Sequence, residues 1–147
     1  MRVAITLLQY EHGVIRQVLD CLGKAVREGK HLSLFPDIYT FLTEYMDDFH
    51  HGKEERFLFP FMRDSDLMPE TVDDLLEDHR KARELIEAMG ECIHGGEVTE
   101  PEGYMAKGRE LVDHVTRHIQ VEENRVFPRI EESISLEQDQ ELYQRYD

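Results

Sequence analysis

The chain has 147 residues, a formal net charge of −15, 40% hydrophobic residues and 33% charged residues. This length suits one domain with a single core. The acidity argues against nucleic acid or an anionic membrane surface as a partner, because both require clustered Lys and Arg. The two cysteines lie far apart and form no disulfide framework, no signal peptide is evident, and no apolar run approaches the roughly 20 residues of a membrane span. We therefore expect a cytoplasmic protein.

Apolar residues recur at helical spacing through the first half of the chain. From residue 5 they step by three and four positions, with His12 set into the apolar row, which predicts a helix at about 4–28. A Phe-Pro pair then begins a second predicted helix at about 36–59, since proline is favoured in the first turn. Pro60 is expected to end or kink this helix.

The second half repeats this arrangement. A third helix is predicted at about 70–94, with His79 in its apolar row and the glycine pair at 95–96 as its stop. A fourth helix is predicted at about 102–125, again followed by a proline, Pro128. No run of β-branched residues with a period of two indicates a strand.

The four predicted helices make two copies of one helical hairpin, at about 4–60 and about 70–128. A sequence typical of a capping box then opens a short fifth helix at about 135–146. Because the connections are short, sequential helices should pack antiparallel. The sequence therefore predicts an all-α fold, a single domain over 1–147 built as an up-down-up-down four-helix bundle with a short C-terminal fifth helix.

One motif occurs in both hairpins. His50 and His118 are each followed four residues later by a glutamate, Glu54 or Glu122, then by a second glutamate and a Phe-Pro pair. Positions i and i+4 lie on one face of a helix, so the imidazole and the carboxylate point the same way. One nitrogen and one oxygen donor per helix suit a borderline transition metal such as iron, manganese or zinc.

Four helices thus each place a histidine on the inward row, and two of them add a glutamate. A single motif of this kind is usually a solvated ion pair, and a single inward histidine is usually a hydrogen-bonded core residue. Here, however, four histidines and two glutamates are expected at one level of an apolar interior. Each of these polar groups would cost about 1–3 kcal/mol of stability if it had no partner there. Two cations would balance the carboxylates and accept the ring nitrogens. The predicted metal ligands are His12, His50, Glu54, His79, His118 and Glu122.

Other polar residues lie near these positions. His114 occupies an inward slot one turn before His118, as a further ligand, a proton donor or a capped core histidine. His51 is turned by about 100° from its neighbour on a helix and is either an occasional ligand or a surface residue. Glu55 and Glu123 point away from the inward row and are expected in solvent. Both cysteines are expected to be small buried hydrophobic residues.

The inward histidines and the two His/Glu motifs, ending in Leu-Phe-Pro and Val-Phe-Pro, cover nearly the whole chain. In this the chain resembles the hemerythrin-like, or HHE cation-binding, family. The resemblance implies a non-haem di-iron centre bridged by an oxo or hydroxo group, although the donors also accept manganese or zinc. It implies His12 and His50 on one iron, His79 and His118 on the other, and bridging by Glu54 and Glu122.

The resemblance is closer to the six-ligand HHE proteins than to the oxygen carriers. Oxygen-carrying hemerythrins have a second histidine one turn after that of the third helix, where this chain has Arg83. They also have an aspartate five residues after the last histidine, where this chain has Glu122 after four. Three functions follow as hypotheses: a protein that binds or senses O2, peroxide or NO, a di-iron enzyme that consumes peroxide, and an iron store or donor.

Overall fold

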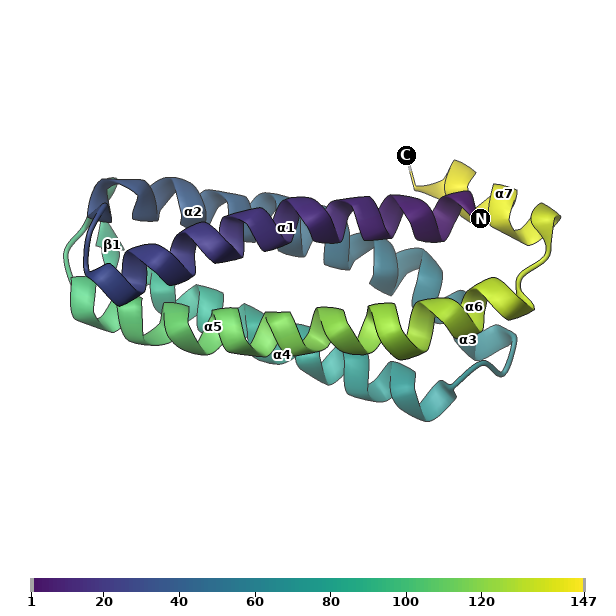
Figure 1. The fold of residues 1–147 in the computed structure, drawn as a ribbon. Helices are drawn as coiled ribbons and strands as arrows, with labels where there is room; N and C mark the ends of the chain where they lie inside the picture. The colour runs from purple at the N-terminus through teal and green to yellow at the C-terminus, as the bar shows by residue number, and fades with distance from the viewer. Residues whose placement is uncertain (1, 147) are drawn as a thin grey trace.

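A computed structural model describes residues 2–146, which form an up-down-up-down four-helix bundle with a short helix at one end (Figure 1). The elements are α1 (Val3–Glu28), the 3-10 turn Leu32–Leu34, α2 (Phe35–Phe41), π-helical segments Leu42–His51 and Glu54–Leu58, α3 (Phe59–Asp64), α4 (Pro69–Gly90), β1 (Ile93–His94), β2 (Glu97–Val98), α5 (Pro101–Val121), the π-helical segment Glu122–Val126, α6 (Phe127–Ser133) and α7 (Leu136–Arg145). The second rod of the bundle runs from α2 to α3, and the fourth from α5 to α6. The predicted all-α bundle with its fifth helix is confirmed.

The third helix ends earlier than the sequence predicted. α4 stops at Gly90, and residues 93–98 form a two-stranded antiparallel hairpin in which Ile93 pairs with Val98. Gly95 and Gly96 both have positive φ angles, 60° and 79°. Two consecutive residues of this kind make a tight hairpin turn that side chains with a Cβ rarely allow. The glycine pair therefore turns a hairpin instead of stopping a helix.

The two Phe-Pro pairs do not end their helices. The rods continue to Asp64 and Ser133, past Pro60 and Pro128. Just before each proline the helix widens: the Phe59 N–H donates to the carbonyl five residues earlier, and Phe127 does the same. A proline lacks an N–H and its ring clashes with the carbonyl four residues back. A π turn removes that clash without breaking the rod, and such turns are frequent at functional sites.

A layer of polar residues divides the core of the bundle into two apolar clusters. One cluster fills the end near the hairpin, and the other fills the end near α7. The first includes Ile15, Leu19, Met46, Ala82, Leu111 and Val115, and the second includes Ile5, Leu8, Leu58, Leu75, Phe127 and Ile130. Every rod crosses from one cluster to the other, and each crossing reverses the direction of the one before. This alternation is what an up-down-up-down topology requires.

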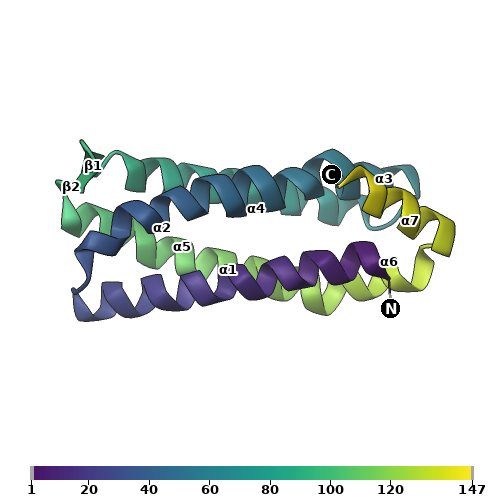
Figure 2. The same cartoon turned by 90° about the horizontal axis from the view of Figure 1, so that it is seen from above.

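The C-terminal helix covers the end of the bundle at which α1 begins (Figures 1 and 2). Asp139 accepts hydrogen bonds from the Val3 and Ala4 backbone N–H groups, both at 2.9 Å. It thus caps the start of α1, which has no cap of its own. The predicted capping box of α7 is present, between Ser135 and Gln138. No helix in the described part of the chain has the length and apolar character needed to cross a membrane.

Candidate metal centre

The polar layer contains the six residues predicted as ligands. One comes from α1, two from the second rod, one from α4 and two from the fourth rod. Both glutamates begin a π-helical segment, Glu54 in the second rod and Glu122 in the fourth. All six side chains are buried, and the most exposed of them, His118, is only 4% exposed. The structure therefore brings the six predicted residues together.

Each glutamate contacts one histidine of the first hairpin and one histidine of the second. Glu54 lies 3.6 Å from Nε2 of His50 and 3.1 Å from Nε2 of His79. Glu122 lies 3.0 Å from Nε2 of His12 and 3.5 Å from Nε2 of His118. The four Nε2 atoms thus face the centre of the layer, and the two carboxylates lie between the histidine pairs. Carboxylates in this position could bridge two cations.

The opposite ring nitrogen of each histidine is bound by a second carboxylate. The Nδ1–oxygen distances are 2.9 Å for His12–Glu123, 2.7 Å for His50–Glu11, 2.8 Å for His79–Glu55 and 2.9 Å for His118–Asp78. A carboxylate on Nδ1 orients the ring, places the proton there and leaves the Nε2 lone pair free for a metal. Glu55 and Glu123 were expected in solvent, but they are only partly exposed, because the neighbouring helix brings a histidine to each of them.

These outer carboxylates repeat between the hairpins, although Glu11 and Asp78 were not among the predicted site residues. Each directly precedes an inward histidine, and their offset, 78 − 11 = 67, is that of the hairpin repeat. Glu55 and Glu123 directly follow the motif glutamates, with an offset of 123 − 55 = 68. Paired acidic residues at the repeat offset were therefore a signal available in the sequence. Lys53 is also buried, and its ammonium group pairs with Glu11.

Several polar atoms in the layer have no hydrogen-bond partner. They are Nε2 of His50, both carboxylate oxygens of Glu54 and Oε2 of Glu122. Burial lowers the pKa of His50 and of His79, which keeps these rings in the neutral form that binds metals. In two groups of residues, one ligand atom from each member lies within 4.8 Å of those of the others, and the two groups share Glu54. They are His12, His50, Glu54 and Glu122, and His51, Glu54, His79 and His118.

The pKa values of Glu54, Glu122 and His118 are shifted in different directions. Burial raises the pKa of Glu54 well above its ordinary value, and the charge of Glu122 raises it further. Burial acts in the same direction on Glu122, but His118 and a hydrogen bond with His12 outweigh it and hold the pKa well below the ordinary value. Burial lowers the pKa of His118, yet Glu122 and Asp78 raise it to about 9. Binding of a cation to His118 is therefore expected to compete with its proton.

The structure also places the other singled-out residues, His114, His51 and the two cysteines. His114 is half-buried and donates from Nε2 to the Asp78 backbone carbonyl at 2.9 Å, as a capped histidine does. His51 is only 2% exposed, so the surface alternative was wrong. Cys92 is buried as expected, whereas Cys21 is exposed, because it lies on the outer side of α1.

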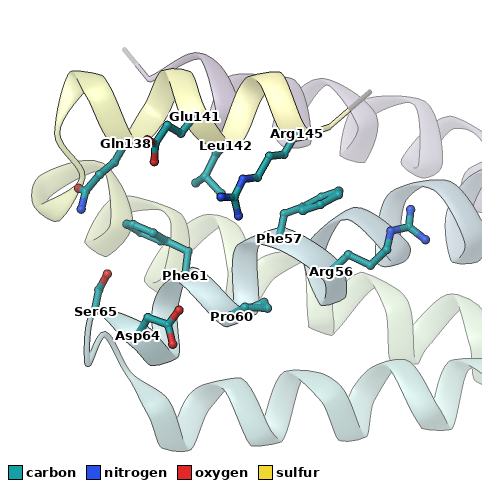
Figure 3. A pocket seen from close by; sticks show the side chains of 10 residues that line it. All are labelled: Arg56, Phe57, Pro60, Phe61, Asp64, Ser65, Gln138, Glu141, Leu142 and Arg145. Atoms are coloured by element: carbon teal, nitrogen blue, oxygen red, sulfur yellow. The ribbon is translucent and has the colours of Figure 1, made fainter.

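Two of the pockets beside the C-terminal helix α7 differ in whether they reach the polar layer. One, of about 290 Å³, is formed by α3 and α7 and is lined by none of the candidate ligands (Figure 3). The other, of about 440 Å³, is lined by Leu7, Tyr10, Glu11, Tyr45, Phe49, Lys53, Tyr143 and Tyr146. Glu11 lines this second pocket and also accepts the hydrogen bond of His50, so one carboxylate contacts both the pocket and the histidine layer.

The fold and the buried His/Glu layer define a helical-bundle protein with groups of side chains able to hold metal cations. The family model for the hemerythrin HHE cation-binding domain matches residues 3–130. The chain belongs to this family, which confirms the resemblance seen in the sequence. A search of curated proteins found no match, and a search of solved structures found none either.

Proposed function

We propose that this protein holds a carboxylate-bridged pair of iron ions and uses it to bind or sense O2, peroxide or NO. The observation that carries the proposal is the pair of buried donor groups that share Glu54. Cation binding is the property for which the family is described. The finer assignment, two ions and iron, draws its support from the donor set and from the outer carboxylates.

The donor set fits iron better than a structural zinc site. Structural zinc is usually held by a closed tetrahedral set, commonly with cysteine, and both cysteines lie outside the donor groups. Four imidazoles and two carboxylates exceed the four positions of such a site and suit two ions. Manganese accepts the same donors, so metal analysis has to decide between them.

Each residue then has a role in holding the pair. His12 and His50 would hold one ion, His79 and His118 the other, and the two glutamates would bridge them. When bound, the iron pair would supply one-electron redox chemistry and a coordination position for a small molecule. The carboxylates on Nδ1 keep the imidazoles in register, and the apolar clusters on either side exclude bulk water.

The pocket beside Glu11 supports a small molecule as the partner. Its wall is largely aromatic, and its polar end is the Lys53–Glu11 ion pair next to His50. The same observation favours a second candidate, a di-iron enzyme that consumes peroxide, because these groups could hold or move a proton at the pocket end of the centre. The third candidate, an iron store or donor, gains no support from a fully enclosed set of donors.

Metal analysis combined with an anaerobic optical spectrum tests the proposal. We expect two iron ions per chain, and a change in the visible spectrum when O2, peroxide or NO is added. A stable adduct supports binding or sensing, whereas turnover of added peroxide that is lost in Glu54→Ala supports the enzyme. A protein that binds fewer than two ions per chain, or whose iron-loaded spectrum responds to none of the three molecules, would refute the proposal.

A further inference from the structure

His51 has the surroundings of a ligand although it lies outside the inward row of its helix. It is buried, and it belongs to the donor group that contains Glu54, His79 and His118. Its ring stacks on that of His79, with centroids 3.8 Å apart and planes at 15°. The π-helical segment Leu42–His51 contributes to this placement, because a wider turn rotates each successive residue by less than an α-helix does. His50 and His51 therefore both reach the polar layer.

Asp47 and Arg83 hold His51 from behind. Asp47 lies one turn earlier on the same rod, and its carboxylate is 3.3 Å from Nδ1 of His51. The Arg83 guanidinium of α4 donates from Nε to both oxygens of Asp47, at 2.9 and 3.0 Å. It also donates to Glu55, the carboxylate that binds Nδ1 of His79. One guanidinium thus connects the two carboxylates that support adjacent histidines.

The carboxylate on Nδ1 separates the histidines of this chain into two sets. His51 shares that feature with the four predicted histidine ligands, and all five are buried. The other histidines with described partners differ: His114 donates to a backbone carbonyl, and His94 pairs with the hydroxyl of Thr99. Because Asp47 occupies Nδ1 of His51, Nε2 is the atom left for a cation.

We infer that His51 is a fifth imidazole ligand, on the ion held by His79 and His118, and that Arg83 is the residue that positions it. This inference rests on the proposed metal pair. It makes the two metal positions unequal, with three imidazoles at one and two at the other. The third imidazole comes from the second rod, and Arg83 on α4 orients it without contacting the metal.

The test compares two substitutions that differ in what they keep. His51→Phe keeps an aromatic ring that can stack on His79 but removes the nitrogen donor, and His51→Gln keeps a polar side chain of similar length. His114→Gln is the matched control, since His114 is capped by a backbone carbonyl. Each purified protein is loaded with iron, and two readouts are taken: metal content under chelator competition and X-ray absorption, which counts imidazoles around the metal.

We expect five imidazoles for two irons in the native protein and in His114→Gln, and four in both His51 variants. We also expect one of the two ions to be held at least about tenfold more weakly in the His51 variants. Arg83→Gln should weaken the same ion, and Arg83→Lys should restore part of the loss because an ammonium group can still bind Asp47.

Unchanged metal affinity and an unchanged imidazole count in His51→Phe and in His51→Gln would overturn the inference, since His51 would then be a packing residue only. That outcome leaves the iron pair intact. If the native protein itself binds fewer than two ions, the proposed function fails instead, so the two failures are distinguishable. Circular dichroism of the metal-free variants confirms that they are folded, and either folded His51 variant alone decides the question.

Discussion

Glu123 provides a direct test of whether the outer carboxylates prepare the histidines for a metal. Its carboxylate lies 2.9 Å from Nδ1 of the fully buried His12 and accepts a hydrogen bond from Arg16 at 2.6 Å. In Glu123→Ala the His12 ring keeps its contact with Glu122 but loses the group that fixes its orientation and its proton. We therefore expect weaker metal binding and a less stable metal-free protein.

The structure sets the size of both effects. Removing an outer partner of a metal-bound histidine typically costs 10–100-fold in metal affinity, about 1.4–2.7 kcal/mol. A buried N–H left without a partner costs about 1–3 kcal/mol of stability. The Glu123 side chain is 21% exposed, so water can partly replace it. Both effects should therefore fall toward the lower ends of these ranges.

Affinity is measured by competition with a chelator of known strength, and stability by urea unfolding of the metal-free protein. Glu132→Ala, which removes an exposed carboxylate of α6, is the control for a change in net charge. If Glu123→Ala binds metal as tightly as Glu132→Ala does while remaining folded, the outer carboxylate has no part in preparing His12, and the reasoning fails.

Four further outcomes follow from the same contacts. Glu54→Leu should prevent binding of a pair of ions, because the two donor groups share Glu54. It should also raise the urea midpoint of the metal-free protein, since it removes two buried oxygens without a hydrogen-bond partner; a lower midpoint would contradict this. Glu11→Ala should lower stability by about 3–5 kcal/mol because it leaves the buried Lys53 ammonium unpaired, and Lys53→Met in the same chain should recover much of that loss. Asp139→Ala should cost about 1.5–3 kcal/mol, since two backbone N–H groups of α1 lose a charged acceptor, and thermal unfolding measures it. Metal affinity should rise as the pH is raised from 6 to 9. The reason is that the pKa of His118 is raised to about 9, so below that pH its imidazole carries a proton that it must lose to bind a cation. Calorimetry in buffers of different ionisation enthalpy counts the protons released.

The sequence alone predicted the bundle because its information is local and repeated. Apolar steps of three and four residues define each helix and its inward face. The offset of 118 − 50 = 68 residues places the two His/Glu motifs at one level of an antiparallel bundle. Packing that buries the four apolar faces turns these six side chains inward, and the short connections between antiparallel helices bring them to about one level. That is why the fold and the members of the layer could be predicted without coordinates.

The structure departs from the predicted helices at the Phe-Pro pairs and at the glycine pair, which the spacing of apolar residues does not reveal. A proline can stop a helix or be accommodated by a π turn, and at Pro60 and Pro128 the π turn is found. Gly95 and Gly96 can cap a helix or turn a hairpin. In each case both conformations suit the residues, and contacts elsewhere in the chain select one.

Only the tertiary structure decided what lies beside the inward rows. A residue next to an inward histidine or glutamate is turned by about 100° from it on the helix. Its side chain then faces either solvent or the neighbouring helix, according to how the rods pack. For Glu55, Glu123 and His51 it is the neighbouring helix, which makes two of them supports for histidines and buries the third beside His79. Sequence periodicity specifies the inward face of each helix. The contacts of the residues beside that face depend on the crossing angle and the rotation of two neighbouring helices. The members of the polar layer could therefore be predicted from the sequence, whereas the contacts of the outer carboxylates with its histidines depended on how the helices pack.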